Sequence, residues 1–298
     1  MYVPGPRGLS RRVFALVVAA SLGISACSLP GSVTETVTGT AAPESDPDPV
    51  PSEVIEELDG QPLAYQLDEI AGIVADDLDV QVGIAVFDEA GVQQAGRLMS
   101  GAAWSTVKVP LAVAALRSDP DLVPVVNAAI EESDNDVAVE LWESLGDAVS
   151  AREQVEAVLR ETGDEVTVID GDHFEENSRG FGDSEWTLAA QAKLAVQMRC
   201  MAGAGPVLES MGHINDEHRY GLGQVADTVF KGGWGPDEDT GDYLVRQFGL
   251  FPVGSGEVGI ALAVHPGDGS YETGQLALTR IAEALEPVLD DARPVSCR

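Results

Sequence analysis

Hydrophobic residues follow two different periods along the chain, and together they predict a mixed α/β fold. Over residues 63–74 and 278–285 they recur every three or four positions, which predicts an amphipathic helix near each end of the sequence. Over 80–86 every second residue is a branched apolar one, which predicts a strand that turns at Asp88-Glu-Ala-Gly91. Three more strand-like segments follow one another at 225–231, 243–251 and 258–264. The order is therefore helix, strands, helices, strands and helix.

The central part of the chain is predicted to be helical. A run of helix-favouring residues from Leu111 to Leu116 places Ser105 near the N-terminal end of a helix. Further helices are predicted over 125–132, 137–145 and 187–201. Ser150 and Glu153 match a capping box at the start of another helix, which ends near Gly163.

Residues 1–27 have the features of an export segment. A basic start precedes an apolar stretch over 13–26, which is too short for a standard transmembrane helix. Ser10-Arg-Arg-Val-Phe14 resembles a twin-arginine signal, and Ile24-Ser-Ala-Cys27 resembles a lipobox. The segment predicts lipidation of Cys27 and a location at the extracytoplasmic face of the cell membrane. The alternative is an ordinary cleaved secretory signal in which the cysteine is incidental.

The rest of the chain divides into a tether and one domain. Residues 28–52 are rich in Ser, Thr, Pro and Asp and show no periodicity, which predicts a flexible tether. Residues 53–298 suit one α/β domain, and we expect a monomer. The net charge of −33 becomes more negative without the basic export segment, which argues against nucleic acid as a partner and against a basic membrane-binding patch. A solvated acidic surface explains this charge most simply, and adaptation to a salt-rich environment is the alternative.

The cysteines and histidines predict a disulfide and no metal site. With Cys27 lipidated, Cys200 and Cys297 can pair in an oxidising compartment and fix the C-terminal tail; two idle thiols are the alternative. The four histidines show no metal-ligand spacing. The sequence carries neither a phosphate loop nor a dinucleotide fingerprint, so we expect no metal and no cofactor.

Three short motifs follow one another along the chain: Ser105-Thr-Val-Lys108, Ser133-Asp-Asn135 and Lys231-Gly-Gly233. Residues three apart on a helix share a face, which brings Lys108 beside Ser105. A serine hydroxyl becomes a nucleophile when a neighbouring base takes its proton. Lys108 can be that base if burial and a second cation lower its pKa, and Lys231 is the candidate for the second cation.

The second and third motifs each have a simpler alternative. Ser133 can relay a proton and Asn135 can donate a hydrogen bond to a substrate amide, but Asn135 or Asp136 can equally cap the helix that follows. Lys231-Gly-Gly233 is predicted to follow a strand among turn residues, where glycines let backbone amides approach a ligand. The alternative is a basic residue at a hairpin turn.

As an ordered set, the motifs resemble the Ser-x-x-Lys, Ser-Asp-Asn and Lys-Thr-Gly motifs of class A β-lactamases and penicillin-binding proteins. The resemblance covers residues 63–289, and the flanking segments 104–111 and 128–135 are similar as well. The run Lys231 to Trp234 resembles the Lys-x-Gly-Trp motif of actinobacterial lipoproteins of the serine-hydrolase type. The resemblance implies an antiparallel sheet flanked by helices, an all-helical lobe beside it, and a cleft between them.

The same resemblance implies a role for each motif residue. Ser105 would be acylated, Lys108 would act as a base, and Ser133 would pass a proton to the leaving nitrogen. The backbone amides of Ser105 and Trp234 would form the oxyanion hole, typically the largest single catalytic effect. The resemblance implies four substrate-binding residues: Asn135, Lys231, Gly233 and Trp234. Lys231 would hold a substrate carboxylate.

Three departures from the family pattern affect the expected activity. Gly232 replaces the hydroxyl residue of Lys-Thr-Gly. His173 stands where efficient lactamases carry a glutamate four residues before an asparagine, here Asn177, and Glu175 and Glu176 are out of register. Only 28 residues separate Ser105 from Ser133, so a helical insert is missing and one side of the cleft is expected to be open. The pattern predicts acylation without rapid deacylation.

The predicted protein is a lipid-anchored serine hydrolase acylated by a β-lactam or by a peptidoglycan-like amide or ester, with poor β-lactam turnover. The open cleft favours a substrate larger than a β-lactam. The alternative is a binding or scaffold lipoprotein of the cell envelope that keeps the fold without turnover.

Overall fold

The computed structural model describes residues 49–171, 180–237, 239–254, 256–290 and 292–295. The export segment with Cys27, most of the tether, residues 173–177 and Cys297 lie outside the described residues, so the predictions made for them stay predictions. The first helix, α1 (Ser52–Leu58), begins one residue before the predicted start of the domain. None of the helices in the described ranges is both long and apolar enough to cross a membrane.

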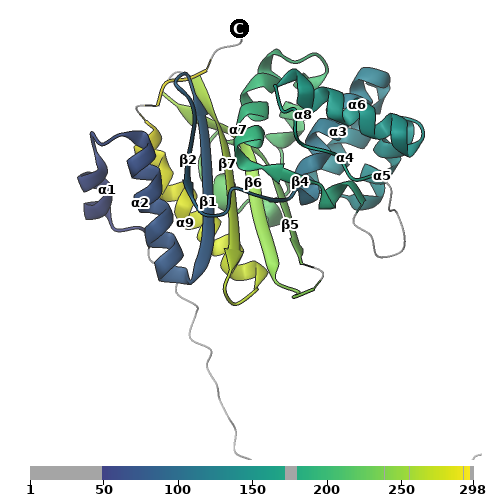
Figure 1. The fold of residues 1–298 in the computed structure, drawn as a ribbon. Helices are drawn as coiled ribbons and strands as arrows, with labels where there is room; N and C mark the ends of the chain where they lie inside the picture. Colours follow the sequence, from purple (N-terminus) through teal and green to yellow (C-terminus); the bar gives the residue numbers. More distant parts are fainter. Residues whose placement is uncertain (1–48, 172–179, 238, 255, 291, 296–298) are drawn as a thin grey trace, which may run out of the picture. The chain divides into compact units, whose positions relative to one another are not determined.

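An antiparallel five-stranded sheet forms the centre of the fold, with strand order β2-β1-β7-β6-β5 (Figure 1). Its strands are β1 (Val80–Asp88), β2 (Gly91–Gly96), β5 (Val229–Pro236), β6 (Tyr243–Val253) and β7 (Gly256–Pro266). The turn between Asp88 and Gly91 joins β1 to β2 as predicted. β5 lies at the edge of the sheet, so one side of its backbone is left for contacts outside the sheet.

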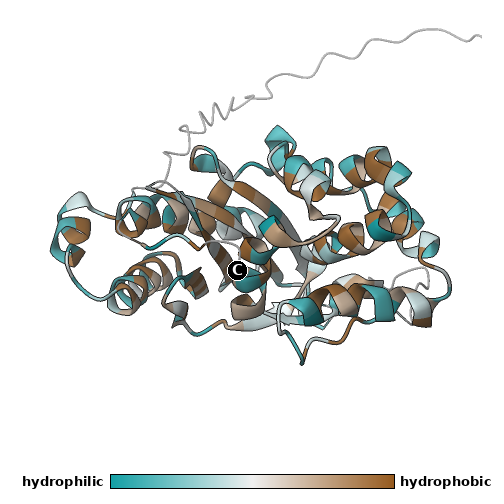
Figure 2. Ribbon diagram, turned by 90° about the horizontal axis from the view of Figure 1, so that it is seen from above, coloured by the Kyte–Doolittle hydropathy of each residue, from teal (hydrophilic) through white to brown (hydrophobic). Residues whose placement is uncertain are grey.

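Helices cover both faces of this sheet. α2 (Leu63–Leu78) and α9 (Tyr271–Leu289) pack on one face, and α7 (Leu188–Gln197) packs on the other. The apolar stripe predicted over 63–74 is the buried face of α2, where Leu67, Ile70 and Val74 have no exposed surface. The strands are mainly hydrophobic and the helices carry both kinds of surface (Figure 2), as expected for a sheet covered on both faces.

Five of the helices in the described residues form a lobe beside the edge of the sheet (Figure 1). They are α3 (Lys108–Ser118), α4 (Val123–Glu131), α5 (Asn135–Ser144), α6 (Ala148–Glu161) and α8 (Ala204–Met211). A separate strand pair, β3 (Ser100–Ala102) and β4 (Glu185–Thr187), lies where the chain passes between sheet and lobe. The predicted fold class, an antiparallel sheet flanked by helices with a helical lobe beside it, is confirmed.

Ser105 lies near the N-terminal end of a helix as predicted, in a 3₁₀ turn, η1 (Trp104–Val107), that leads directly into α3 at Lys108. Two other local predictions are wrong. Lys231-Gly-Gly233 lies inside β5 rather than in a turn after a strand, and Gly233 serves close packing rather than a bend. The cap of α6 is Asp147, whose carboxylate accepts from the Ser150 amide at 2.8 Å, rather than a Ser150–Glu153 box.

Candidate functional site

The three motifs meet between β5 and the helical lobe. The Lys231 ammonium lies 3.0 Å from the Ser133 hydroxyl, and the Lys108 ammonium lies 3.5 Å from the same oxygen. Lys108 also donates to the Ser133 carbonyl at 2.5 Å and to Asn135 Oδ1 at 2.7 Å. Lys231 donates to its neighbouring carbonyl, that of Gly232, at 2.9 Å. One serine hydroxyl therefore bridges two lysines that are far apart in the sequence.

The turn between α4 and α5 places Ser133 in this bridge. Ser133 has a φ of 57°, a left-handed conformation that is unusual for a residue with a side chain. Asp134 caps α5 by accepting from the Val137 amide at 3.0 Å, so the cap is neither Asn135 nor Asp136. Because Asp134 takes the capping role, the Asn135 side chain can accept from Lys108 and point its amide group elsewhere.

Burial perturbs both lysines. The exposed fractions are 1% for Lys108 and 2% for Lys231. Burial lowers the pKa of Lys108 to about 7, against the opposing charge of Asp134. Burial also lowers the pKa of Lys231 well below its usual value, and the nearby charge of Lys108 adds to this effect. A substantial fraction of Lys108 is therefore neutral near pH 7, as a general base requires.

The turn that carries Ser105 rests directly on β5. A Cβ atom at residue 233 would lie 2.9 Å from the Ala103 carbonyl oxygen and 3.0 Å from the amide nitrogen of Ser105, so only glycine fits there. Trp104, just before the half-buried Ser105, has a φ of 50°. Its ring covers Gly235, where a Cβ atom would lie 2.4 Å from ring carbons. Two glycines of the edge strand thus let the serine turn and the strand touch.

The surroundings of Gly232 are less crowded than those of Gly233. A Cβ atom there would lie 3.7 Å from the Trp234 ring and 3.7 Å from the Tyr220 hydroxyl, which are ordinary contact distances. The space beside Gly232 can therefore accept a Cβ atom without a shift of its neighbours. Of the two glycines in the motif, only Gly233 is required by the packing.

Trp234 belongs to a row of aromatic rings beside Lys231. Its ring centroid lies 4.8 Å from that of His218 and 5.4 Å from that of Tyr271. Burial lowers the pKa of His218, and the charge of Lys231 lowers it further. In the sequence, His218 is one of four scattered histidines with no metal-ligand spacing. No local pattern could have joined residues 218, 234 and 271, because only the folded sheet brings them together.

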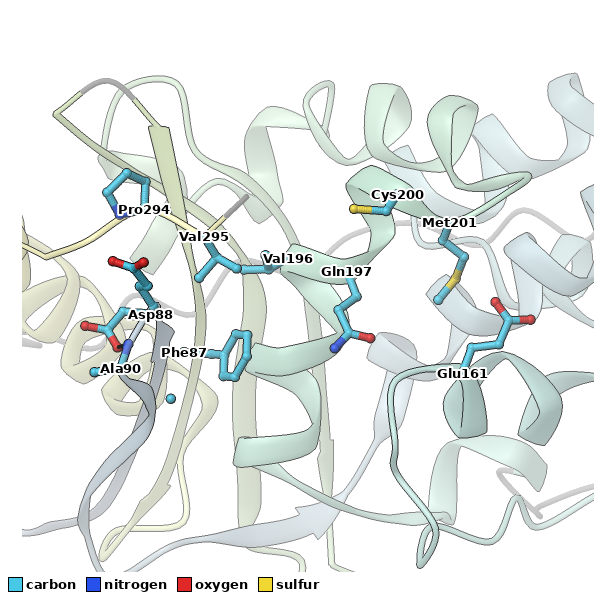
Figure 3. Close-up of a pocket in the computed structure, with 12 residues that line it drawn as sticks. Phe87, Asp88, Ala90, Glu161, Val196, Gln197, Cys200, Met201, Pro294 and Val295 are labelled. Carbon is cyan, nitrogen blue, oxygen red and sulfur yellow. Dashed lines mark hydrogen bonds between the residues drawn. The ribbon is translucent and has the colours of Figure 1, made fainter. Parts of the chain in front are cut away.

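The predicted disulfide concerns a different region. Cys200, at the end of the 3₁₀ turn η4 (Met198–Cys200), is disulfide-bonded, while Cys297, its predicted partner, lies outside the described residues. Cys200 lines a cavity of about 560 Å³ together with Phe87, Val196 and Glu161 (Figure 3). None of the residues that line this cavity belongs to the lysine and serine cluster, so the cavity is separate from that cluster.

The residues described contain no group of three or more His, Cys, Asp or Glu side chains that could hold a metal ion. The side chains that the structure brings together at this site offer hydroxyl, ammonium and amide groups. A serine hydroxyl on a fixed turn, two lysines of lowered pKa and a bridging hydroxyl suit acyl transfer.

Comparison with known proteins shows the fold. No protein-family model matches the chain. No curated protein matches its sequence. Among solved structures, a representative class A β-lactamase from Bacteroides cellulosilyticus is 14% identical with a TM-score of 0.65, covering 78% of this chain and 99% of its own. A class A β-lactamase from Mycobacterium abscessus is 19% identical with a TM-score of 0.59, and the match covers 75% of this chain and 98% of that one.

A β-lactamase from Xanthomonas campestris is 17% identical with a TM-score of 0.60, and the match covers 76% of this chain and 98% of that one. Nearly the whole length of each of these structures is thus matched by residues of this chain. The chain has the class A β-lactamase fold.

Proposed function

We propose that this protein is a serine hydrolase of the β-lactamase type that forms an acyl-enzyme at Ser105. The observation that carries the proposal is the Ser133 hydroxyl held between Lys108 and Lys231 beside the strand on which the Ser105 turn rests. The fold supports it, because the similar solved structures are class A β-lactamases.

Acylation begins with proton transfer from the Ser105 hydroxyl to the neutral amine of Lys108. The serine oxygen attacks the carbonyl carbon of an amide or ester, and the amides of Ser105 and Trp234 stabilise the oxyanion. The carbon–nitrogen bond of the amide, or the carbon–oxygen bond of the ester, then breaks, and the Ser133 hydroxyl gives its proton to the leaving nitrogen or oxygen. The ammonium of Lys108, 3.5 Å from Ser133, replaces that proton, which returns Lys108 to its neutral form.

Lys231 is proposed to bind a carboxylate of the substrate. An anion beside Lys231 favours its charged form, which burial otherwise disfavours. The amide of Asn135 is proposed to bind the substrate on the other side of the cleft. These contacts favour peptide-like acyl donors that carry a carboxylate, such as β-lactams and peptidoglycan fragments.

Deacylation is proposed to be slow. The support is in the sequence, where His173 stands at the position of the glutamate that activates water in efficient lactamases. We further propose that Cys27 is lipidated and holds the domain at the extracytoplasmic face of the membrane. Slow deacylation and the absence of a hydroxyl at Gly232 also support the second candidate, a scaffold protein without turnover.

A turnover screen separates the two candidates. The protein and its Ser105→Ala variant are incubated with p-nitrophenyl esters and with peptides that end in D-amino acids, and product release is followed. Steady release by the wild-type chain that is lost in Ser105→Ala supports the hydrolase. Release that is equal in both forms contradicts the assignment of Ser105, and no release from any substrate favours the scaffold.

A further inference from the structure

Arg246 on β6 is completely buried, and its hydrogen-bond acceptors are all uncharged, with the charge of Glu185 acting on it without a hydrogen bond. Its exposed fraction is 0%, and it donates four hydrogen bonds. Nη1 donates to the carbonyls of Gly101 at 2.7 Å and Ala102 at 2.9 Å, and Nη2 donates to the Trp186 carbonyl at 3.0 Å and to Gln191 Oε1 at 2.6 Å. Burying a charge costs several kcal/mol unless its partners are well placed, so a residue that only filled this space would be better apolar.

Two acceptors of Arg246 lie on the segment that leads into the Ser105 turn. Gly101 and Ala102 belong to β3 and come a few residues before Ser105. On the other side of Ser105, the Gln191 side chain donates to Thr106 Oγ1 at 2.9 Å, and the Thr106 hydroxyl donates to the Ala103 carbonyl. The network therefore holds the chain both before and after Ser105.

The register of the sheet explains why Arg246 reaches this segment. Arg246 is the cross-strand partner of Gly233, and directly opposed residues in an antiparallel pair point to the same face. That is the face on which the Ser105 amide rests against Gly233. Of this cross-strand pair, Gly233 allows the Ser105 turn to approach β5 closely, and Arg246 anchors the segment that precedes the turn.

The turn needs such an anchor because its backbone is strained. Trp104 has a φ of 50°, and a bulky residue in a left-handed conformation costs about 1–3 kcal/mol and persists only where its surroundings hold it. The hydrogen bonds from Arg246 and Gln191, together with the one from the Ala103 amide to the Ser184 carbonyl at 2.8 Å, hold residues on either side of Trp104.

We propose that Arg246 is a positioning residue for acyl transfer, acting through β3 and through Gln191 and Thr106 to fix the Ser105 hydroxyl and amide against β5. This inference rests on the proposed acylation of Ser105. Arg246 itself does not touch the substrate. Loss of the Arg246 guanidinium leaves substrate binding intact and shifts the Ser105 hydroxyl away from its position for attack.

The test compares Arg246→Lys and Gln191→Leu with Arg280→Lys. Arg280 is the matched control, because it is 6% exposed and donates to Asp77 at 2.9 Å, in an ion pair that joins α9 and α2 away from the site. For each variant we would measure thermal unfolding, the limiting acylation rate constant and apparent Kd for benzylpenicillin and a p-nitrophenyl ester, and amide hydrogen exchange of Ser105 and Thr106.

The expected result is an acylation rate constant reduced about tenfold to hundredfold in Arg246→Lys and Gln191→Leu, with the apparent Kd changed less than about threefold. Exchange at Ser105 and Thr106 should quicken in both, while Arg280→Lys loses stability and acylates at the wild-type rate. If Arg246→Lys does not fold, Gln191→Leu decides the matter.

Two results would overturn the inference. One is wild-type acylation in both Arg246→Lys and Gln191→Leu. The other is a loss of rate in Arg280→Lys that matches its loss of stability to the same degree, which would make Arg246 a stabilising residue only. If the wild-type protein is acylated by neither probe, the proposed function fails, and this inference fails with it.

Discussion

Replacing Gly233 by alanine should abolish most acylation, while the same change at the adjacent Gly232 should not. A Cβ atom at residue 233 would lie 2.9 Å from the Ala103 carbonyl oxygen and 3.0 Å from the amide nitrogens of Ser105 and Thr106. All three are backbone atoms, which cannot turn aside as a side chain can. The strand and the serine turn must therefore separate.

The size of the effect follows from these distances. Ordinary contact begins at 3.4 Å, so a separation of about 0.5 Å is needed. That shift moves the amides of Ser105 and Trp234 apart, and the loss of one oxyanion donor costs about 100-fold or more in rate, or about 2.7 kcal/mol of transition-state stabilisation. Crowding of this kind should also lower the free energy of unfolding by about 1–3 kcal/mol.

The assay is the rate of covalent labelling by a penicillin, measured beside thermal unfolding for both variants. In Gly232→Ala the added Cβ meets its neighbours at 3.7 Å or more, so labelling and stability should stay near wild type. Equal labelling rates in Gly233→Ala and the wild type would refute the close-approach argument. Equal losses in both variants would show that the strand tolerates no side chain in this motif.

Three further predictions follow from the same geometry. The acylation rate should rise with pH through about 7 as Lys108 loses its proton. Asp134→Asn should move this rise to lower pH, because the Asp134 charge raises the pKa of Lys108 and asparagine can still cap α5. An unshifted pH profile in this variant would contradict the role of Lys108 as the base. Ser133→Ala should slow acylation of the enzyme by amide substrates by about 100-fold or more, because it removes the proton relay. Acylation by esters with good leaving groups should slow less, and stopped-flow rates for the two substrate types measure the difference. Ile84→Val, at a fully buried position of β1, should lower the free energy of unfolding by about 1 kcal/mol in urea titration and leave acylation unchanged.

The motif chemistry could be predicted because each motif is local. Ser105 and Lys108 are three residues apart, and Ser133 and Asn135 share one short turn, so the sequence spacing carries much of their geometry. The structure brings Lys108, Ser133, Asn135 and Lys231 into one hydrogen-bonded cluster. Their roles in acyl transfer remain proposals.

The continuation of β5 through Gly232 and Gly233 could not be predicted from the sequence. Glycine pairs commonly mark turns, and nothing near Gly233 indicates that another backbone segment lies on it. The reason for the glycine is the Ser105 turn, more than 100 residues earlier in the chain. A contact of that range has no local signal.

The helix caps show the same limit at shorter range. Asp147 caps α6, where Ser150 with Glu153 was the predicted box, and Asp134 caps α5, where a cap at Asn135 or Asp136 was the alternative to a functional role. Both interpretations found the right turn and misplaced the cap by one to three residues, because several neighbouring side chains can all accept from the first amides of a helix.

Arg246 is the clearest case of a residue that the sequence could not assign. It stands in a strand of mostly apolar residues, where a charged side chain is usually expected to face solvent. Its acceptors come from β3, β4 and α7, and their meeting point exists only in the folded chain.

The most direct test of the proposed function is the intact mass of the protein, followed over time after addition of a penicillin. The proposal predicts a mass increase equal to the whole penicillin, located on Ser105 by peptide mapping, absent from Ser105→Ala, and lost far more slowly than it forms. An unchanged mass, or an adduct that persists in Ser105→Ala, would contradict the proposal that Ser105 is the nucleophile.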